Sequence, residues 1–425
     1  MPDKLTSDVG DCQWAMKKIL YLTYDGLTDH LGQSQVLAYL ANLADDLTHI
    51  DVISFEKKDN FVNNIELVNE AITNKNINWQ PLSYTKNPPI ISTLKDLFLC
   101  WLRAKKLNKE KNYDIVHCRG HLVSLIGKRM KKEYGTRFIF DMRAWWADEK
   151  IESGHWKGPI FKLVYICMKK LEVKLMRKSD YTISLTYAGK DEIVRNNWKE
   201  SGNVKVIPTG VDLDHFKKVD FNKRQTVRAH LGIPEKAKVL IYSGSVGGNY
   251  AIEKILSSAR AFKRLYTNGR TLILSKTEPE VFLNTVNQEE LRSLNIIFLC
   301  LSYRDVPAYL MVGDFGLIIY QKAFSLVGRS PTKLSEYWAC GLPVLSFKGV
   351  GDLDQLQKKY PFALFLIEEF EEEQIINGLK SLNGASSRKD LRRAAIESFD
   401  KSKGVKLYKT LYDLLSSKRN NLTAI

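Results

Sequence analysis

Short apolar runs rich in β-branched residues alternate with amphipathic segments through most of this 425-residue chain. The first such run covers about residues 18–24, and a helical segment follows at about 33–47. This alternation predicts parallel strands whose sheet is covered by helices on both faces. It stops in a polar stretch at about 211–238, which we expect to be irregular, and restarts at 239. The sequence therefore predicts an α/β protein with two doubly wound, Rossmann-like domains.

We expect an N-terminal domain over residues 1–210 and a C-terminal domain over 211–403. The final segment, 404–420, is typical of an amphipathic helix with no strand after it, and we expect it to pack back on the first domain. Open parallel sheets bind ligands at the carboxyl ends of their strands. A cleft between the two sheets is therefore the expected active site.

The overall composition limits the function classes. A net charge of +16 favours an anionic partner such as nucleic acid, a membrane surface or a phosphorylated substrate. The six cysteines are scattered without metal-ligand spacing, which favours a reducing compartment. The first residues lack the apolar segment of a secretory signal, and no apolar stretch approaches the length of a membrane span. We expect a cytoplasmic protein, either soluble or bound to a membrane face.

Residues 330–341 carry start and stop signals for a short helix. Ser330 is expected at the N-cap and Pro331 at the first helical position. The helix follows a predicted strand, so its free N–H groups and the ammonium group of Lys333 would attract a phosphate. Glu336, on the same face, could accept the hydroxyls of a ribose. The alternative is a capped helix with a surface pair between Lys333 and Glu336.

A glycine-rich loop at 243–248 lies between a predicted strand and a predicted helix. Its small residues would let backbone N–H groups approach an anion closely. The spacing matches neither a P-loop nor the G-x-G-x-x-G pattern. Two anion-suited elements in one predicted domain nevertheless favour a phosphate-bearing ligand.

Two polar loops follow predicted strands of the first domain. Gly32 and Gln33 lie in the first, where the alternative is an ordinary strand-to-helix turn. Asp141, Arg143 and Asp148 flank two tryptophans in the second. Aromatic rings stack on sugars and carboxylates accept sugar hydroxyls, so this loop could be a sugar platform. The alternative is a buried structural network between Arg143 and Asp148.

Other polar groups carry a weaker signal. His117, Arg119 and His121 lie at the end of one predicted strand. The Asp-x-Asp triplets at 212–214 and 352–354 are expected in a turn and at a helix start, so we predict no metal site.

Several of these segments, in order along the chain, resemble the retaining glycosyltransferases of family 4, which have the GT-B fold. The matching text, from Lys17 to Asp352, is KILYLTYDGLTDHLGQSQVL, FDMRAWWADE, VKVIPTGVDLDHF, VLIYSGS, SPTKLSEYWACGLPVLSF and GVGD. The resemblance is most specific at VIPTGVD and SPTKLSEYWACG.

The resemblance implies a metal-independent sugar transfer that retains the anomeric configuration. The nucleotide-sugar donor, expected to be UDP-linked, would bind the second domain, and a glycan or undecaprenyl-pyrophosphate-linked acceptor would bind the first. No further cofactor is expected. Together with the residue pattern, it assigns donor contacts to Ser243, Gly244, Ser245, Arg329, Ser330, Thr332, Lys333 and Glu336. Acceptor contacts are assigned to Gly32, Gln33, Asp141, Arg143 and Asp148. The expected catalytic residues are Glu336, Lys333 and Arg143.

Two positions depart from the family pattern. Gly328 stands eight residues before Glu336, where the family usually has a glutamate that contacts the donor sugar. Ser245 replaces a common arginine, so Lys333 or Arg329 would supply the positive charge. A nucleotide-sugar epimerase of the same architecture is one alternative function. A nucleic-acid-binding protein is another, although no nucleic-acid motif is present and we expect no such partner.

The positive charge is concentrated in one part of the sequence. Residues 1–100 carry 8 basic and 13 acidic groups, whereas residues 101–180 carry 20 basic and 9 acidic groups. Basic residues interleaved with large apolar ones suit an anionic membrane surface. We therefore expect peripheral binding of the first domain to the inner face of the plasma membrane. The alternative is a solvated helix face.

Overall fold

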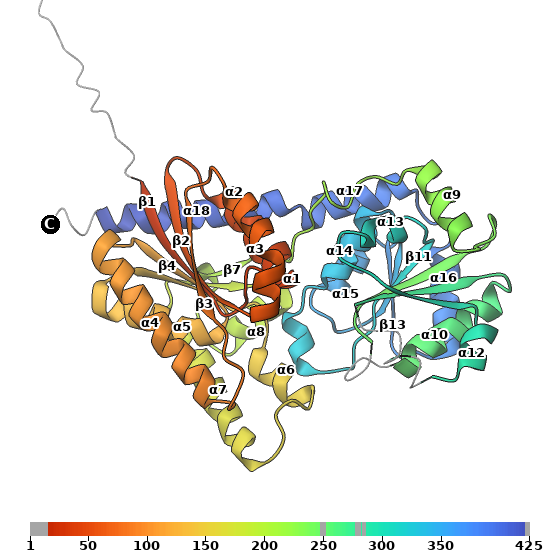
Figure 1. Cartoon of the computed structure of the whole chain (residues 1–425). Coiled ribbons are helices and arrows are strands. Elements are labelled where there is room, and N and C mark those ends of the chain that lie inside the picture. Colours follow the sequence, from red (N-terminus) through yellow and green to blue (C-terminus); the bar gives the residue numbers. More distant parts are fainter. Residues whose placement is uncertain (1–15, 247–251, 277–281, 283–285, 421–425) are drawn as a thin grey trace, which may run out of the picture. The chain divides into compact units, whose positions relative to one another are not determined.

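The computed structural model describes residues 16–246, 252–276, 282 and 286–420. It contains two sheets, and Figure 1 shows the strands of each sheet flanked by helices. The predicted pair of Rossmann-like sheets is therefore confirmed.

The first sheet has seven strands in the order β3-β2-β1-β4-β5-β6-β7. The pairs β1–β2, β2–β3, β5–β6 and β6–β7 are parallel. The bounds of its strands are β1 Lys17–Thr23, β2 Thr48–Glu56, β3 Ile77–Ser83, β4 Ile115–Arg119, β5 Arg137–Asp141, β6 Tyr181–Ser184 and β7 Val204–Val206. The connecting helices are α1 His30–Gly32, η1 Gln33–Leu37, α2 Ala38–Leu43, α3 Lys58–Ile72, α4 Ile91–Lys111, α5 His121–Tyr134, α6 Trp146–Glu152, α7 Pro159–Lys178, α8 Tyr187–Arg195 and η2 Ser201–Asn203.

The second sheet has six strands in the order β10-β9-β8-β11-β12-β13, and all neighbouring strands are parallel. The bounds of its strands are β8 Val239–Ser243, β9 Arg270–Ser275, β10 Ile296–Cys300, β11 Phe315–Leu317, β12 Val344–Phe347 and β13 Leu364–Ile367. The strand order reverses direction between β8 and β11. This is the topological switch point at which such sheets bind ligands.

Helices α10 and α16 pack against each other on one face of the second sheet, and α14 and α17 pack on the other (Figure 1). The helix bounds here are α9 Phe221–His230, α10 Ile252–Leu265, α12 Gln288–Ser293, α13 Val306–Leu310, η3 Phe324–Gly328, α14 Thr332–Ala339, α15 Leu353–Lys359, α16 Glu372–Leu382, α17 Arg388–Phe399 and α18 Lys401–Asn420. In the described part of the chain, every helix is too short or too polar to span a lipid bilayer.

Helix α9 corrects the prediction that the stretch 211–238 is irregular throughout. Asp220 caps the helix, because its side chain accepts hydrogen bonds from the N–H groups of Asn222 and Lys223. The helix has few apolar residues, which is why the periodicity of the sequence did not reveal it.

The described chain divides into two compact units. One comprises the residues up to Cys118, Leu122–Phe138 and the chain from Tyr408 onward, and the other comprises Arg119–His121 and Ile139–Leu407. The expected domain boundary between residues 210 and 211 stays a prediction.

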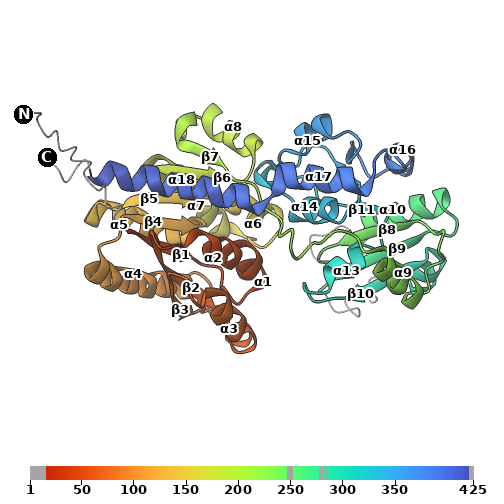
Figure 2. The same ribbon diagram turned by 90° about the horizontal axis from the view of Figure 1, so that it is seen from above.

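Within the first unit, the last helix, α18, supplies partners to earlier parts of the chain (α18 is drawn in blue in Figure 2). The hydroxyl of Tyr412 lies 2.7 Å from Nδ1 of the buried His117. The ring of Tyr408 makes an edge contact with the ring of Tyr39. These contacts tie α18 to β4 and α2.

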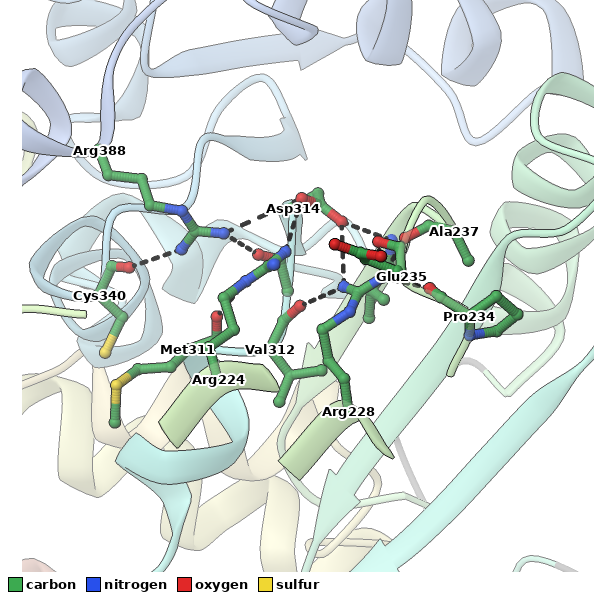
Figure 3. A network of polar contacts seen from close by, with 12 residues as sticks. Arg224, Arg228, Pro234, Glu235, Ala237, Met311, Val312, Asp314, Cys340 and Arg388 are labelled. Atoms are coloured by element: carbon green, nitrogen blue, oxygen red, sulfur yellow. Dashed lines mark hydrogen bonds and ion pairs between the residues drawn. The ribbon is translucent and has the colours of Figure 1, made fainter. Parts of the chain in front are cut away.

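A charged network lies at the amino ends of β8 and β11. Figure 3 shows Asp314, which directly precedes β11, surrounded by the guanidinium groups of Arg224, Arg228 and Arg388. The shortest of these ion pairs, Arg224 to Asp314, is 3.1 Å. The same carboxylate accepts a hydrogen bond from the N–H of Val239, at the start of β8. One acidic group is therefore shared by three cations and joins two neighbouring strands at the edge opposite their carboxyl ends.

We predict that Asp314→Asn lowers the free energy of unfolding by about 2–4 kcal/mol, because three partly buried guanidinium groups lose their shared anion. Urea denaturation measures the change. The exposed carboxylate of Glu373, in the first turn of α16, gives the matched control Glu373→Gln, which should shift stability by less than about 0.5 kcal/mol. Equal stability of the two variants would contradict the role of Asp314.

Candidate functional site

Tyr337 holds α14 at the carboxyl ends of β8 and β11. Its ring lies against Gly316 of β11, where a Cβ atom would come within 2.7 Å of the ring. Its hydroxyl accepts a hydrogen bond from the N–H of Ser243 at 2.7 Å and can donate to the carbonyl of Ile241 or of Leu317. Tyr337 was not among the predicted site residues, although it lies within the motif. It fixes the helix at the switch point of the second sheet.

The start of α14 differs by one residue from the prediction. Pro331, not Ser330, is the N-cap residue, and the helix begins at Thr332. The hydroxyl of Ser330 instead accepts a hydrogen bond from the N–H of Thr209 at 3.2 Å. Neither Ser330 nor Pro331 caps the helix through a side chain, so the first N–H groups of α14 keep no side-chain cap.

Lys333 and Glu336 form the predicted pair on one face of α14. The ammonium group lies 2.8 Å from the carboxylate, and Glu336 is 2% exposed. Lys276, which follows β9, lies close enough that partial desolvation and the charge of Lys333 both lower the pKa of Lys276. One ammonium group thus pairs with a buried carboxylate at the helix start, and a second lies near the first, an arrangement suited to an anionic ligand.

The loop after β8 lies beside this helix start. The N–H of Gly244 donates to the carbonyl of Leu274 on β9, and the hydroxyl of Tyr242 donates to the carbonyl of Ser245. Because the N–H of Ser243 bonds to the α14 tyrosine, the loop and the helix are brought together. The last two residues of the predicted loop, 247 and 248, lie outside the described residues.

Two rings that were not predicted as site residues stack nearby. Tyr303, three residues beyond β10, packs on the ring of His215 with a centroid distance of 4.6 Å. Burial raises the pKa of Tyr303, and the charge of Glu336 raises it further, so the phenol lies near that carboxylate. His215 belongs to the sequence VKVIPTGVDLDHF that carries the family resemblance. This aromatic pair, of which Tyr303 lies near Glu336, is suited to stacking with a ring of a ligand.

Arg329 lies just before the start of α14 and has a partner of its own. Its guanidinium group lies 2.7 Å from the carboxylate of Glu149 on α6 and 5.2 Å from the ring centre of Tyr320. The structure therefore brings Arg329 to helix α6, which contains Asp148, and brings Lys333 to Glu336.

Gly328 packs directly on a buried tryptophan. A Cβ atom at this position would lie 2.7 Å from Cδ1 and 2.9 Å from Nε1 of Trp145, which is fully buried. The carboxylate of Glu152 also holds this segment, because it accepts a hydrogen bond from the N–H of Phe324 at the start of η3. The departure from the family pattern at Gly328 thus has a local cause, since the indole occupies the space of a side chain.

Asp141, Arg143 and Asp148 do not form one network. Arg143 has φ +61°, an unusual backbone conformation for a residue other than glycine, and its Nη1 lies 3.8 Å from Asp141. Asp148 instead pairs with Lys169 at 2.6 Å and accepts a hydrogen bond from Tyr165. The alternative of a buried structural network between Arg143 and Asp148 is therefore wrong, because Asp148 pairs with Lys169 instead.

Lys169 is the centre of that second group. Burial would lower the pKa of Lys169, but the negative charges of Glu172 and Asp148 outweigh it and raise the pKa. The ammonium group also lies 4.8 Å from the ring centre of Trp145. Glu172 in turn lies 2.9 Å from Nε2 of His121. This network holds α6 against α7, and it accounts for Asp148 structurally.

A buried carboxylate shapes the loop before Gly32 and Gln33, which lie in the helices α1 and η1 and not in the predicted loop. Glu56, at the end of β2, accepts hydrogen bonds from the N–H groups of Leu27 and Thr28 at 2.8 and 3.0 Å, and from the hydroxyl of Thr28. A Cβ atom at Gly32 would lie 1.8 Å from the carbonyl oxygen of Gly26, so only glycine fits there. Glu56, which is 4% exposed and ends an apolar strand, was not among the predicted site residues.

The aspartate triplets have structural partners. Asp212 accepts from the N–H groups of Asp214 and His215 and pairs with Lys401. Asp352 accepts from two N–H groups at the start of α8. No group of three metal-ligating side chains occurs within residues 16–246, 252–276, 282 and 286–420.

The sequence pattern of the family described as Glycosyltransferase Family 4 matches residues 32–215. The chain resembles the glycosyltransferases of family 4. One relative is the Escherichia coli UDP-Gal:alpha-D-GlcNAc-diphosphoundecaprenol alpha-1,3-galactosyltransferase, 26% identical over 76% of this chain and 80% of that protein. Another is the D-inositol 3-phosphate glycosyltransferase of Streptomyces avermitilis, 28% identical over 32% of this chain. The chain spans only 28–43% of the length of the first curated relatives that it matches.

A solved structure supports the predicted fold over most of the chain. The Anabaena protein HepE in complex with UDP and glucose aligns with a TM-score of 0.66 at 15% identity, over 93% of this chain and 99% of that one. The predicted GT-B fold, with its two Rossmann-like sheets, is therefore confirmed. The roles of the predicted site residues stay predictions.

We predict that Gly328→Ala lowers the free energy of unfolding by about 1–3 kcal/mol, because the added methyl group overlaps Trp145. Gly328→Glu, which restores the usual residue of the family, should cost more. Denaturant unfolding measures both changes.

Gly202→Ala is the matched control, because a Cβ atom there meets nothing within 4 Å. An alanine at position 328 that is tolerated as well as one at 202 would contradict the packing argument.

Proposed function

We propose that this protein is a retaining, metal-independent glycosyltransferase that moves a sugar from a UDP-linked donor to a glycan or undecaprenyl-pyrophosphate-linked acceptor. The observation that carries the proposal is the cluster at the switch point of the second sheet. There α14, the loop after β8 and the Lys333–Glu336 pair meet at one sheet edge. The family resemblance and the fold support the same function.

The donor diphosphate would bind at the start of α14. A lysine ammonium group has three donors, so Lys333 can bond to Glu336 and to a phosphate oxygen at once. Gly244 and Ser245 would line the same phosphates, and Lys276 would add a second positive charge. Glu336 would accept ribose hydroxyls.

The same groups would lower the barrier to transfer. Negative charge develops on the leaving UDP as the glycosidic bond breaks, and positioned cations and N–H groups stabilise it. The acceptor hydroxyl would attack from the face of the leaving group, and the leaving phosphate would take its proton. This route retains the anomeric configuration and needs no enzyme nucleophile. Lys333 is the residue that we propose to act directly on the leaving group.

In the first unit, Gly32, Gln33 and the loop before them would contact the acceptor. Asp141 and Arg143, which belong to the second unit, stay proposed acceptor contacts. Glu56 would act as a positioning residue, because it holds the backbone of the first loop. A lipid-linked acceptor lies in a membrane, so we propose peripheral binding at the cytoplasmic leaflet.

We predict that Lys333→Ala weakens the binding of UDP by about 10- to 100-fold, as expected for the loss of one charge-assisted hydrogen bond. Isothermal titration calorimetry measures the affinity. Lys380→Ala is the control, because Lys380 is an exposed lysine in the last turn of α16. Unchanged UDP affinity in Lys333→Ala would contradict the assignment.

The reaction itself is tested by incubating the protein with UDP-sugars and acceptor and assigning the product by NMR. A product with the donor's anomeric configuration supports the proposal, and an inverted product contradicts retention. Conversion of the UDP-sugar to its epimer without acceptor would establish the epimerase alternative instead.

A further inference from the structure

Helix α4 of the first unit has an apolar outer face. Its inner face is packed, and the buried Trp101 contacts both the ring of Tyr134 and the guanidinium group of Arg129. The outer face carries large apolar residues at spacings of three or four, namely Ile91, Leu94, Phe98 and Leu102. These four side chains are between 46% and 65% exposed. Their spacing puts them in one row along about 16 Å of the helix.

Single exposed apolar residues are common, but a continuous row on a folded monomer marks an interaction surface. The row does not extend to the end of α4. In the second half of the helix the outward positions are occupied by Arg103, Lys106 and Lys109, with Glu110 as the exposed acidic group. Lys95 adds a positive charge within the apolar half. The outer surface of α4 is thus apolar first and basic afterwards.

Helix α7 of the second unit repeats this order. Ile160, Leu163 and Ile166 are 49–62% exposed in its first half. Lys170, Lys174, Arg177 and Lys178 are exposed in its second half. A helix in which apolar side chains precede a basic segment fits a bilayer surface, because the apolar groups enter the acyl boundary while the cations meet lipid phosphates.

We propose that the outer face of α4 docks on an anionic lipid bilayer, with Ile91, Leu94, Phe98 and Leu102 inserted and the lysines on the headgroups. The charge of the basic half selects a lipid surface over an uncharged apolar protein partner. The inference rests on the proposed function, because an enzyme that acts on a lipid-linked acceptor must dock on the bilayer that holds this acceptor. It adds the surface that makes the contact, and α7 supplies a second surface of the same chemistry.

The test is co-sedimentation of the whole protein with phosphatidylcholine vesicles that contain or lack phosphatidylglycerol. We expect binding to the anionic vesicles at low salt. Leu94→Ser/Phe98→Ser should reduce the partition coefficient by about tenfold or more. Lys106→Gln/Lys109→Gln should reduce it by roughly fivefold per charge and weaken its salt dependence.

Val62→Ser/Leu67→Ser is the matched control. Val62 and Leu67 are 69% and 52% exposed on α3 of the same unit, a helix with three acidic residues and one lysine. This control should bind vesicles like the wild type. The four substituted side chains, Leu94, Phe98, Val62 and Leu67, are all exposed. Both double variants should therefore melt at the same temperature as the wild type.

The proposal is overturned if the wild type does not sediment with anionic vesicles, or if Leu94→Ser/Phe98→Ser binds them as well as the control. UDP affinity measured on the same samples separates this result from the proposed function. Vesicle binding without UDP binding would retain the docking surface and reject the glycosyltransferase. UDP binding without vesicle binding would reject the docking surface and retain the proposed glycosyltransferase.

Discussion

The hydroxyl of Tyr337 is the contact on which the candidate site depends. It satisfies the N–H of Ser243 inside the protein, where an unpaired donor would cost about 1–3 kcal/mol. The absence of a side chain at Gly316 makes room for the ring. The short helix α14 is therefore held at a fixed place relative to two strands, and Lys333 and Glu336 follow from that placement. The Asp314 network joins the amino ends of the same two strands. The residues at their carboxyl ends are therefore available to bind a ligand.

The loop of the first unit is built on the same physical principle. A buried carboxylate, Glu56, satisfies the N–H groups of Leu27 and Thr28, and Gly32 approaches the carbonyl of Gly26 too closely for any side chain. In both units the residues that would touch a ligand are positioned by polar groups buried at strand ends. Such groups are costly unless paired, so each pairing also fixes the loop above it.

Local patterns in the sequence predicted the alternation of strands and helices, the two sheets and the pair on α14, because each depends on residues close in the chain. Contacts between residues distant in the chain could not be predicted from these local patterns. The packing of Gly328 on Trp145 joins positions 183 apart, and nothing near either residue signals it. The cap of α14 was assigned to Ser330 because its hydroxyl was expected to bond locally, yet Thr209 takes that bond. Helix α9 was missed because its stability depends on a cap and on tertiary packing more than on its own apolar periodicity.

The central claim is that the carboxyl edge of the second sheet binds the nucleotide of the donor. Hydrogen–deuterium exchange with and without UDP tests it most directly. The account predicts slower exchange of amides at 330–337 and 242–246 when UDP is present, with no change at 26–33. Protection that is absent from the start of α14, or that appears only at 26–33, would contradict it.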